Sequence, residues 1–260
     1  MSSSSTATSV KRSTEDPVFN MFVKCFPETE LEIAGNMKNN VYLISVEGNI
    51  GSGKSTFLER LREKYASHPH VVFAPEPVSV WQTIVDENGV SILEKFYKDQ
   101  ATYAFPFQMM AYISRLAILR RLVRERDTGK PLIIITERSL HTDRHIFAKM
   151  LYDQQKIDEI NYQIYLKWFH EFADDIPVTH CVYLRSDPEV CQKRIAIRAR
   201  IGEDIIPLSY LKECHSYHEK YVEIYDKRLI MDANTDLKTH PERIDEWLSS
   251  FDELVKGLVF

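Results

Sequence analysis

A glycine-rich segment, residues 48–55, has the residue types and spacing that indicate chemistry most plainly. It reads GNIGSGKS, which matches the pattern G-x-x-x-x-G-K-S, and it lies between an apolar segment and a helical pattern. Backbone N–H groups of such a loop, together with the positive end of the next helix, hold phosphate. We therefore predict that Lys54 meets the outer phosphates of a nucleoside triphosphate and that the Ser55 hydroxyl reaches Mg²⁺. The predicted phosphate-binding residues are Gly48, Asn49, Ile50, Gly51, Ser52, Gly53, Lys54, Ser55 and Thr56.

Two acidic residues follow two other apolar segments. Glu76 comes after Val71–Ala74, and Glu137 comes directly after Leu132–Thr136 and before Arg138. Carboxylates at the carboxyl ends of parallel strands face the ligand crevice of an α/β sheet. Either one could take the proton of a hydroxyl that attacks a phosphate, and we rank Glu76 first for that role. The alternative for Glu137 and Arg138 is a structural ion pair.

Polar residues interrupt two otherwise apolar helical patterns. Gln108 and Arg115 are seven residues apart on one helical face, and Asp143 and Phe147 share a face at i and i+4. Buried polar groups need partners, and the edge of a nucleobase would supply them. An internal salt bridge between Arg115 and Asp143 is the alternative, and the two interpretations are compatible.

Three arginines, Arg194, Arg198 and Arg200, form a basic cluster, in which the first two lie at i and i+4 on a predicted helix. Like charges at this spacing repel each other, and a bound triphosphate would relieve the repulsion. A solvated basic helix face is the alternative.

Strand and helix patterns alternate along residues 41–260, which predicts an α/β fold with a parallel sheet. The predicted strands are Val41–Glu47, Val71–Ala74, Leu132–Thr136, His180–Leu184 and Leu229–Met231. The predicted helices are Lys54–Tyr65, Val90–Tyr97, Phe107–Arg126, 140–152, 158–174, 188–199, Pro207–Tyr225 and 241–257, with Pro106 in the first turn of the third.

Composition limits the possible classes of protein. The 260 residues carry a net charge of −5, which argues against a general nucleic-acid surface, and no apolar run is long enough to span a membrane. Four widely spaced cysteines favour a reducing compartment. We expect residues 1–40 to be a flexible extension and residues 41–260 to be one domain. The first 14 residues, rich in Ser and Thr, favour a disordered tail over a transit peptide.

Several ordered motifs resemble the deoxynucleoside kinase family over Val41 to Asp236. They are EGNIGSGKS (47–55), EPVSVW (76–81), FYKD (96–99), FPFQ (105–108), ERS (137–139), DRHIF (143–147) and RIAIRARIGEDIIPLSYL (194–211). The resemblance implies a three-layer P-loop kinase fold, with a five-stranded parallel sheet flanked by helices and a lid at about residues 194–206. Ile201 and Gly202 replace residues that are polar in many members, so lid flexibility could differ from theirs.

The same resemblance assigns roles to residues. It implies that Glu76 is the base acting on the sugar 5′-hydroxyl, that Glu137 lies near Mg²⁺ through water, and that Arg138 lies near the 5′ end. It implies that Phe147 stacks on the base and that Tyr97 and Glu203 hold the 3′-hydroxyl. The implied catalytic residues are Lys54, Glu76, Glu137 and Arg138, and the implied metal site is Ser55 with Glu137. The implied nucleoside-binding residues are Glu76, Val78, Leu93, Phe96, Tyr97, Phe107, Gln108, Arg115, Arg138, Asp143, Phe147 and Glu203.

On the donor side the resemblance implies that Asp236 and Leu237 lie near the adenine of ATP. Members with the Arg115 and Asp143 pair tend to accept deoxycytidine and deoxypurines, whereas apolar or small residues there favour thymidine. Family likeness further implies a cytoplasmic, Mg²⁺-dependent homodimer that is inhibited by its end-product triphosphate. A mitochondrial location is the alternative if residues 1–40 contain a transit peptide.

Two other functions are compatible with the phosphate loop. A nucleoside monophosphate kinase, such as a thymidylate kinase, would need cations where Glu76 stands, because a carboxylate repels the acceptor phosphate. A nucleotide-binding interaction module would keep the loop without transferring phosphate. The joint presence of Lys54, Glu76, Glu137 and Arg138 favours a nucleoside kinase over both.

Overall fold

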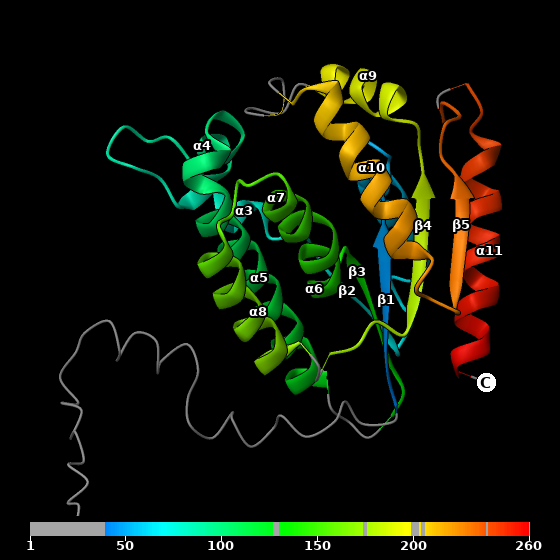
Figure 1. Cartoon of the computed structure of the whole chain (residues 1–260). Coiled ribbons are helices and arrows are strands. Elements are labelled where there is room, and N and C mark those ends of the chain that lie inside the picture. The colour runs from blue at the N-terminus through cyan, green and yellow to red at the C-terminus, as the bar shows by residue number, and fades with distance from the viewer. Residues whose placement is uncertain are drawn as a thin grey trace, which may run out of the picture. The chain divides into compact units, whose positions relative to one another are not determined.

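Five apolar segments form one parallel sheet in the computed structural model, which describes residues 40–126, 130–173, 176–198, 203, 206–237 and 239–259. The strands are β1 (Val41–Glu47), β2 (Val71–Ala74), β3 (Leu132–Glu137), β4 (His180–Arg185) and β5 (Arg228–Asp232). Their order across the sheet is β2-β3-β1-β4-β5 (Figure 1). Every residue of β3 is buried, as expected for a central strand with helices on both faces. The predicted five-stranded parallel sheet is confirmed.

Strand register brings the chemically interesting residues to one edge of the sheet. Val46 of β1 pairs with Glu137 of β3, and Ala74 of β2 pairs with Thr136. Since all five strands run in the same direction, the loops that follow β1, β2 and β3 leave the sheet side by side. The phosphate loop, Glu76 and Arg138 are therefore neighbours, although up to 90 residues separate them in the sequence.

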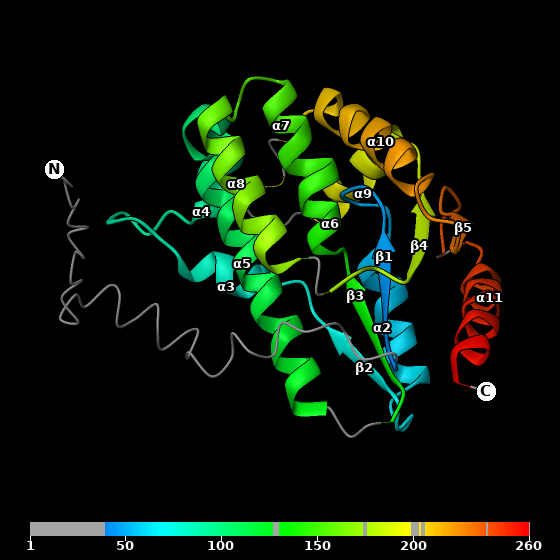
Figure 2. The ribbon, with the colours of Figure 1, turned by 60° about the horizontal axis from the view of Figure 1, so that its bottom comes forward.

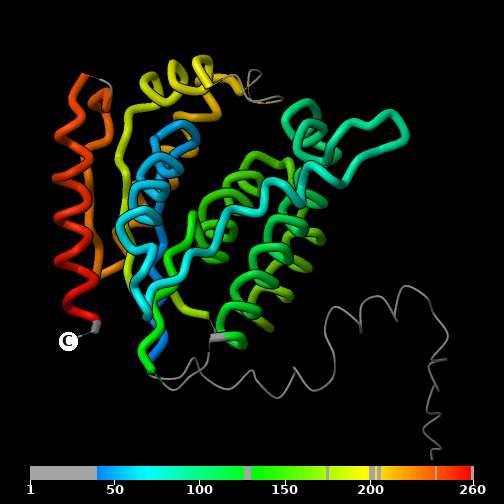
Figure 3. Tube along the Cα trace, turned by 180° about the vertical axis from the view of Figure 1, so that it is seen from behind, coloured from blue at the N-terminus to red at the C-terminus, as the bar shows by residue number. Residues whose placement is uncertain are grey.

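Helices cover both faces of the sheet and complete three layers. On one face, α2 (Lys54–Lys64) and α11 (Glu242–Val259) pack their apolar side chains on the strands, and Figure 3 shows the molecule from this side. Phe57 of α2 meets Trp247 and Phe251 of α11 edge-on, with both pairs of ring centroids 5.9 Å apart. The opposite face is covered by α5 (Gln100–Arg126), α8 (Glu159–Phe172) and α10 (Leu208–Val222), as Figure 2 shows.

Two helices begin at different residues from those predicted. The third predicted helix was expected to start at Phe107, but α5 starts at Gln100, because the Asp99 carboxylate accepts a hydrogen bond from Thr102 N (3.2 Å). Pro106 consequently lies inside the helix rather than in its first turn. Likewise α4 spans Ile92–Lys98, because Ser91 caps it by accepting from Glu94 N.

Other departures concern short elements and element ends. Helix α3 (Val78–Thr83) was not predicted. The helix expected at 140–152 is α6 (Leu140–Thr142), a π-helical segment η2 (Asp143–Ala148) and α7 (Lys149–Asp153). The remaining helix, α9, spans Pro188–Arg198, and the other predicted ends are either exact or differ by one to three residues. Arg200, with the rest of 199–202, residues 204 and 205 of the predicted lid, and all of the predicted extension except Asn40 lie outside the described residues.

No helix in the described part of the chain combines the length and apolar character needed to cross a membrane.

The packing of α11 on α2 leads to a stability prediction. Replacing the fully buried Phe251 with Ala should lower the free energy of unfolding by about 3–5 kcal/mol, since a cavity remains next to Phe57. Ser249→Ala, on the exposed side of the same helix, is the matched control and should change it by no more than about 0.5 kcal/mol. Urea denaturation measures both. A loss below about 1 kcal/mol for Phe251→Ala would contradict this account of the packing.

Candidate active site

The phosphate loop is a turn that requires glycine at particular positions. Gly51 has φ +79°, and a Cβ there would lie 2.6 Å from the Cys191 carbonyl oxygen on α9. Gly53, at φ +101°, is the N-cap of α2 and turns the chain into that helix. Asn49 fixes the other side of the loop by donating to the Leu211 carbonyl at 2.8 Å. The loop is thus held between α9 and α10.

Lys54 places its ammonium group inside the loop. Its Nζ donates to the carbonyl oxygens of Gly48 (3.0 Å) and Asn49 (2.7 Å) and lies 3.9 Å from Glu137 Oε1. Burial and the nearby Arg138 charge lower the pKa of Lys54 to about 8, against the opposing attraction of Glu137 and Glu76. The charge that would meet phosphate is therefore titratable in the neutral-to-alkaline range.

Ser55 and Glu137 lie together beside this lysine. Ser55 Oγ donates to Glu137 Oε2 at 3.3 Å, and Glu137 is itself largely buried. A hydroxyl and a carboxylate next to a phosphate loop form the oxygen-rich set that Mg²⁺ uses with substrate phosphates. Among the described residues, no group of three or more His, Cys, Asp or Glu is arranged to hold a metal by itself. These two residues fit a metal that arrives with a nucleotide.

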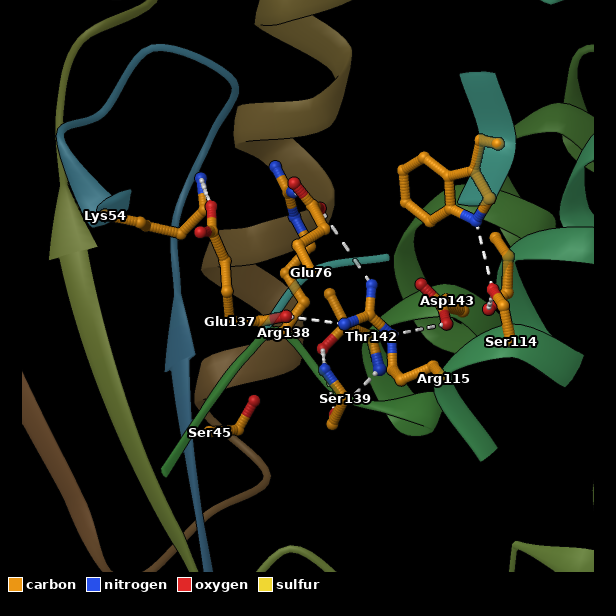
Figure 4. Close-up of polar contacts among 12 residues, drawn as sticks. Ser45, Lys54, Glu76, Ser114, Arg115, Glu137, Arg138, Ser139, Thr142 and Asp143 are labelled. Carbon is orange, nitrogen blue, oxygen red and sulfur yellow. Dashed lines mark hydrogen bonds and ion pairs between the residues drawn. The ribbon is translucent and has the colours of Figure 1, made fainter. Parts of the chain in front are cut away.

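Glu76 is paired with arginine at the end of β2. Its Oε1 accepts from Arg138 Nη1 at 2.6 Å and lies 3.9 Å from Arg115 Nη2, and Figure 4 shows these side chains converging. Burial raises the pKa of Glu76, but the charges of Arg138, Arg115 and Lys54 together outweigh it and lower the pKa below its usual value. Glu76 is therefore an ionised carboxylate at neutral pH, and it points into the crevice beside Lys54.

Arg138 adopts a strained backbone conformation to reach this position. Its φ of +61° lies in the left-handed region, which costs about 1–3 kcal/mol for a residue with a side chain. Its guanidinium contacts Glu76, lies over the Phe147 ring at 5.1 Å, and has Nη2 3.4 Å from the Gly48 carbonyl. Strain of this kind persists only where the surroundings hold it, which marks the turn after β3 as a functional site.

Arg115 and Asp143 form a second buried ion pair. Arg115 Nε donates to Asp143 Oδ2 at 3.0 Å, and its Nη1 donates to the Glu137 carbonyl at 2.5 Å. Burial raises the pKa of Asp143, while the charge and hydrogen bond of Arg115 oppose the rise. Gln108 lies nearby on α5, and its Oε1 is buried without a hydrogen-bond partner among the described residues. An unsatisfied amide beside an ion pair is a polar edge that a ligand can complete.

One cavity of about 620 Å³ joins these groups. It is a size suited to small-molecule substrates and combines aromatic walls with a few polar groups. The predicted residues that line it are Ile50, Gly51, Gly53, Lys54, Ser55, Thr56, Glu76, Val78, Leu93, Phe96, Tyr97, Phe107, Gln108, Arg115, Glu137, Arg138, Asp143, Phe147, Arg194, Arg198, Glu203 and Asp236. The predicted residues Gly48, Asn49, Ser52 and Leu237 are not among its lining residues.

The arginines of α9 have protein partners in this structure. Arg194 donates to the carbonyls of Ala233 (2.8 Å) and Thr235 (2.9 Å), and its Nη1 lies 3.4 Å from the Ser52 carbonyl. Arg198 forms an ion pair with Glu203. The repulsion expected between Arg194 and Arg198 is therefore relieved at least in part by the protein, and Arg194 connects the phosphate loop with the loop after β5.

The cavity also has walls that the sequence did not indicate as site residues. They are Trp81, Val190, Lys193, Ile197, Tyr210 and Asn234. Trp81 lay inside a recognised motif and donates from Nε1 to Ser114 Oγ at 3.0 Å. Tyr210 is buried on α10, where its pattern is that of an ordinary core residue. Only their position in the cavity wall distinguishes these residues.

Comparison with known proteins agrees with this geometry. The deoxynucleoside kinase family profile matches residues 44–256. Human deoxycytidine kinase is 33% identical over 237 residues, covering 80% of this chain and 90% of that protein. Chicken deoxycytidine kinase 2 is 31% identical over 80% of this chain and 88% of its own. The mitochondrial deoxyguanosine kinase of Xenopus laevis is 32% identical over 73% of this chain and 76% of its own.

The profile match includes the phosphate loop, most of β1, the other four strands and the cavity, and the comparisons favour neither the monophosphate kinase nor the non-catalytic module. The chain belongs to the deoxynucleoside kinase family and is an ATP-dependent phosphotransferase that acts on deoxynucleosides.

Proposed function

We propose that this kinase transfers the γ-phosphate of ATP to the 5′-hydroxyl of deoxycytidine and deoxypurine nucleosides in preference to thymidine. The observation that supports this choice is the buried Arg115–Asp143 pair beside the unsatisfied amide of Gln108. Cytosine and adenine each carry an exocyclic amine that donates hydrogen bonds, whereas thymine has a carbonyl and a methyl group there. A carboxylate and an amide oxygen accept from this amine of cytosine or adenine, but they repel the carbonyl of thymine. Guanine has a carbonyl at the same position, but it can offer its own exocyclic amine, N2, to the same acceptors, and thymine has no amine to offer.

Glu76 is the residue proposed to act on the acceptor hydroxyl. Its lowered pKa keeps the carboxylate ionised at neutral pH, so its oxygens are available to the acceptor hydroxyl, and it shares the cavity with Lys54 on the donor side. Arg138, which contacts Glu76 at 2.6 Å, would orient the carboxylate and stabilise charge on the phosphoryl group in transit. Glu137 remains the second candidate for the base.

Ser55 and Glu137 are proposed to hold Mg²⁺, in the case of Glu137 partly through water. When bound, the ion would neutralise charge on the β- and γ-phosphates of the donor. Lys54 would bind the same oxygens, and the Glu137 carboxylate, 3.3 Å from Ser55 Oγ, would keep that hydroxyl in place.

The remaining assignments complete the two substrate sites. On the acceptor side, Tyr97 and Glu203 are proposed to hold the 3′-hydroxyl and Phe147 to stack on the base, and all three line the cavity. On the donor side, Arg194, Arg198, Arg200, Asp236 and Leu237 are proposed to bind ATP. A lid over residues 194–206 would close on the phosphates and exclude water.

We also propose a cytoplasmic homodimer, with a mitochondrial location as the alternative if residues 1–40 direct transport. Ile160 and Ile164 of α8 are 71% and 42% exposed, and exposed apolar residues on one helix favour a contact with a second subunit. Cys181, Cys191 and Cys214 are free and buried, as is usual in a reducing compartment.

The base role leads to a first kinetic prediction. Glu76→Gln should lower kcat by about 10²–10⁴, the usual contribution of a general base, while deoxycytidine still binds. The amide keeps the shape of the side chain and its hydrogen bond from Arg138 but cannot take the proton. Single-turnover kinetics and calorimetric binding separate the two effects. Undiminished turnover would exclude Glu76 from the mechanism.

Base preference can be tested with four deoxynucleosides, their ribose counterparts and thymidine monophosphate, using ATP and magnesium. The wild-type enzyme should prefer deoxycytidine and deoxypurines and leave the monophosphate unchanged. Arg115→Met combined with Asp143→Ala should shift the ratio of kcat/KM towards thymidine by about tenfold or more, the effect of one misplaced polar group. Both partners are changed because a single change would leave a buried charge unpaired.

Arg144→Met is the matched control for that double variant. Arg144 is the next residue along η2 and lies over the Phe169 ring at 4.6 Å, outside the cavity lining. It should leave the order of substrates unchanged. If the double variant also keeps the wild-type order, the account of base choice is wrong. If the wild-type enzyme phosphorylates only the monophosphate, the proposed acceptor is wrong.

A pH dependence follows from Lys54. Its pKa of about 8 means that the ammonium is charged below pH 8 and loses its charge as the pH rises through that value. Since kcat/KM reports the free enzyme, kcat/KM for ATP should fall above about pH 8. Bound triphosphate raises the pKa again, so the fall in kcat should begin at higher pH.

Lys54→Arg tests the assignment of this alkaline decrease. Arginine stays charged throughout the range, so the variant should be less active but should show a flat profile between pH 7 and 9.5. A wild-type profile that stays flat to pH 9.5 would contradict the prediction, as would an unchanged decrease in the variant.

A further inference from the structure

A buried carboxylate behind the active site has no role in the proposed mechanism. Glu47, the last residue of β1, is completely buried immediately before the phosphate loop. Its Oε1 accepts from Ser45 Oγ and from Thr142 Oγ1, while Oε2 is buried without a hydrogen-bond partner in the described part of the chain. Burial raises the pKa of Glu47 above its usual value, against the effect of these two hydrogen bonds.

An incompletely satisfied carboxyl group is an unfavourable choice for this position. Replacing a buried polar group with an apolar residue of similar volume often leaves the protein equally stable or makes it more stable. Natural proteins keep such locally unfavourable groups mainly at functional sites. Glu47 therefore calls for an explanation beyond the stability of the sheet.

Thr142 connects Glu47 to the turn that follows β3. Its hydroxyl donates to Glu47 Oε1 at 2.5 Å and accepts from the Ser139 backbone N–H at 2.9 Å. Ser139 Oγ in turn accepts from Thr142 N at 3.2 Å, so the two residues form a capping box at the start of α6. The Thr142 hydroxyl has a single proton, and it donates that proton to Glu47. This hydrogen bond fixes the orientation of the hydroxyl, so that its oxygen accepts from Ser139 N.

The turn so fixed is the strained one at Arg138. Arg138 N donates to the Val46 carbonyl at 3.1 Å, and the next amide, Ser139 N, is held through Thr142 by Glu47. Two successive amides are thus anchored to two successive residues of β1. Between the two anchors lies the φ of +61° that directs the Arg138 guanidinium towards Glu76 (Figure 4).

We propose that Glu47 and Thr142 are positioning residues for phosphoryl transfer, which hold the Ser139 amide and thereby set the Arg138 guanidinium on Glu76. The inference rests on the proposed roles of Arg138 and Glu76. It adds a chain of contacts from Glu47 of β1 through Thr142 to Ser139 in the turn, and none of these three residues lines the cavity. A loss of geometry in this chain should slow the chemical step more than it weakens binding.

The first test compares two buried threonines. Thr142→Val removes the hydroxyl at nearly constant volume and should lower kcat about tenfold, with both KM values changed by less than about twofold. Thr142→Ser restores the hydroxyl and should recover at least about half of the wild-type kcat. Thr136→Val is the matched control, because Thr136 is equally buried but its hydroxyl has no hydrogen-bond partner among the described residues. It should leave kcat within about twofold of the wild type.

The second test separates positioning from general stability by a double-mutant cycle with Arg138→Met. If Thr142 acts through Arg138, Thr142→Val should lower kcat less than about twofold in the Arg138→Met background. An equal tenfold loss in both backgrounds would overturn the inference, as would equal losses for Thr142→Val and Thr136→Val. If Arg138→Met alone leaves kcat unchanged, the proposed role of Arg138 fails first, which distinguishes that failure from this one.

If Thr142→Val does not fold, Glu47→Gln can replace it in the double-mutant cycle with Arg138→Met. The amide keeps the accepting oxygen but weakens it and places an unpartnered NH₂ where Oε2 lies. We expect kcat to fall about threefold, with the same non-additivity against Arg138→Met. Additive losses would overturn the inference here too.

Discussion

Three cations, Lys54, Arg115 and Arg138, are buried at one edge of the sheet, and the carboxylates between them make this burial possible. An isolated charge in a protein interior costs several kcal/mol, so each cation needs a close partner. Glu76 and Asp143 supply contacts of 2.6 and 3.0 Å, and Glu137 lies 3.9 Å from Lys54. The site is therefore one network of charges, and a change to any member alters the electrostatic field at the others.

The network depends on the register of three parallel strands. Because β1 lies beside β3 and β3 beside β2, the phosphate loop, the Arg138 turn and Glu76 emerge next to each other. Two helical segments complete the cavity wall, since α5 supplies Arg115 and η2 supplies Asp143. Even the strained φ of Arg138 follows from this arrangement, since its N–H must reach the Val46 carbonyl while its side chain turns to Glu76.

Local sequence patterns were sufficient to predict the five strands and the phosphate loop, which have strong periodic or motif signals. The ion pair between Arg115 and Asp143 was one of two compatible interpretations, because spacing within a helix does not show which residue of another helix it meets. The same patterns could not reveal that Asp99 caps α5 or that residues 143–148 form a π-helix, because competing signals such as Pro106 and a regular i, i+4 spacing were equally plausible. Trp81 and Tyr210 were indistinguishable from core residues, since a cavity wall and a core have the same composition.

The charge balance of the network also bears on the acceptor. Arg138 and Arg115 both lie close to Glu76 and are largely neutralised by it and by Asp143, so the crevice offers little net positive charge to a substrate. A neutral nucleoside enters such a site without disturbing the balance, whereas a monophosphate would bring two negative charges against Glu76. After transfer, the product carries those charges. In the proposed mechanism Glu76 is neutral directly after it takes the proton. Once it loses that proton, its charge would disfavour the phosphorylated product and promote its release.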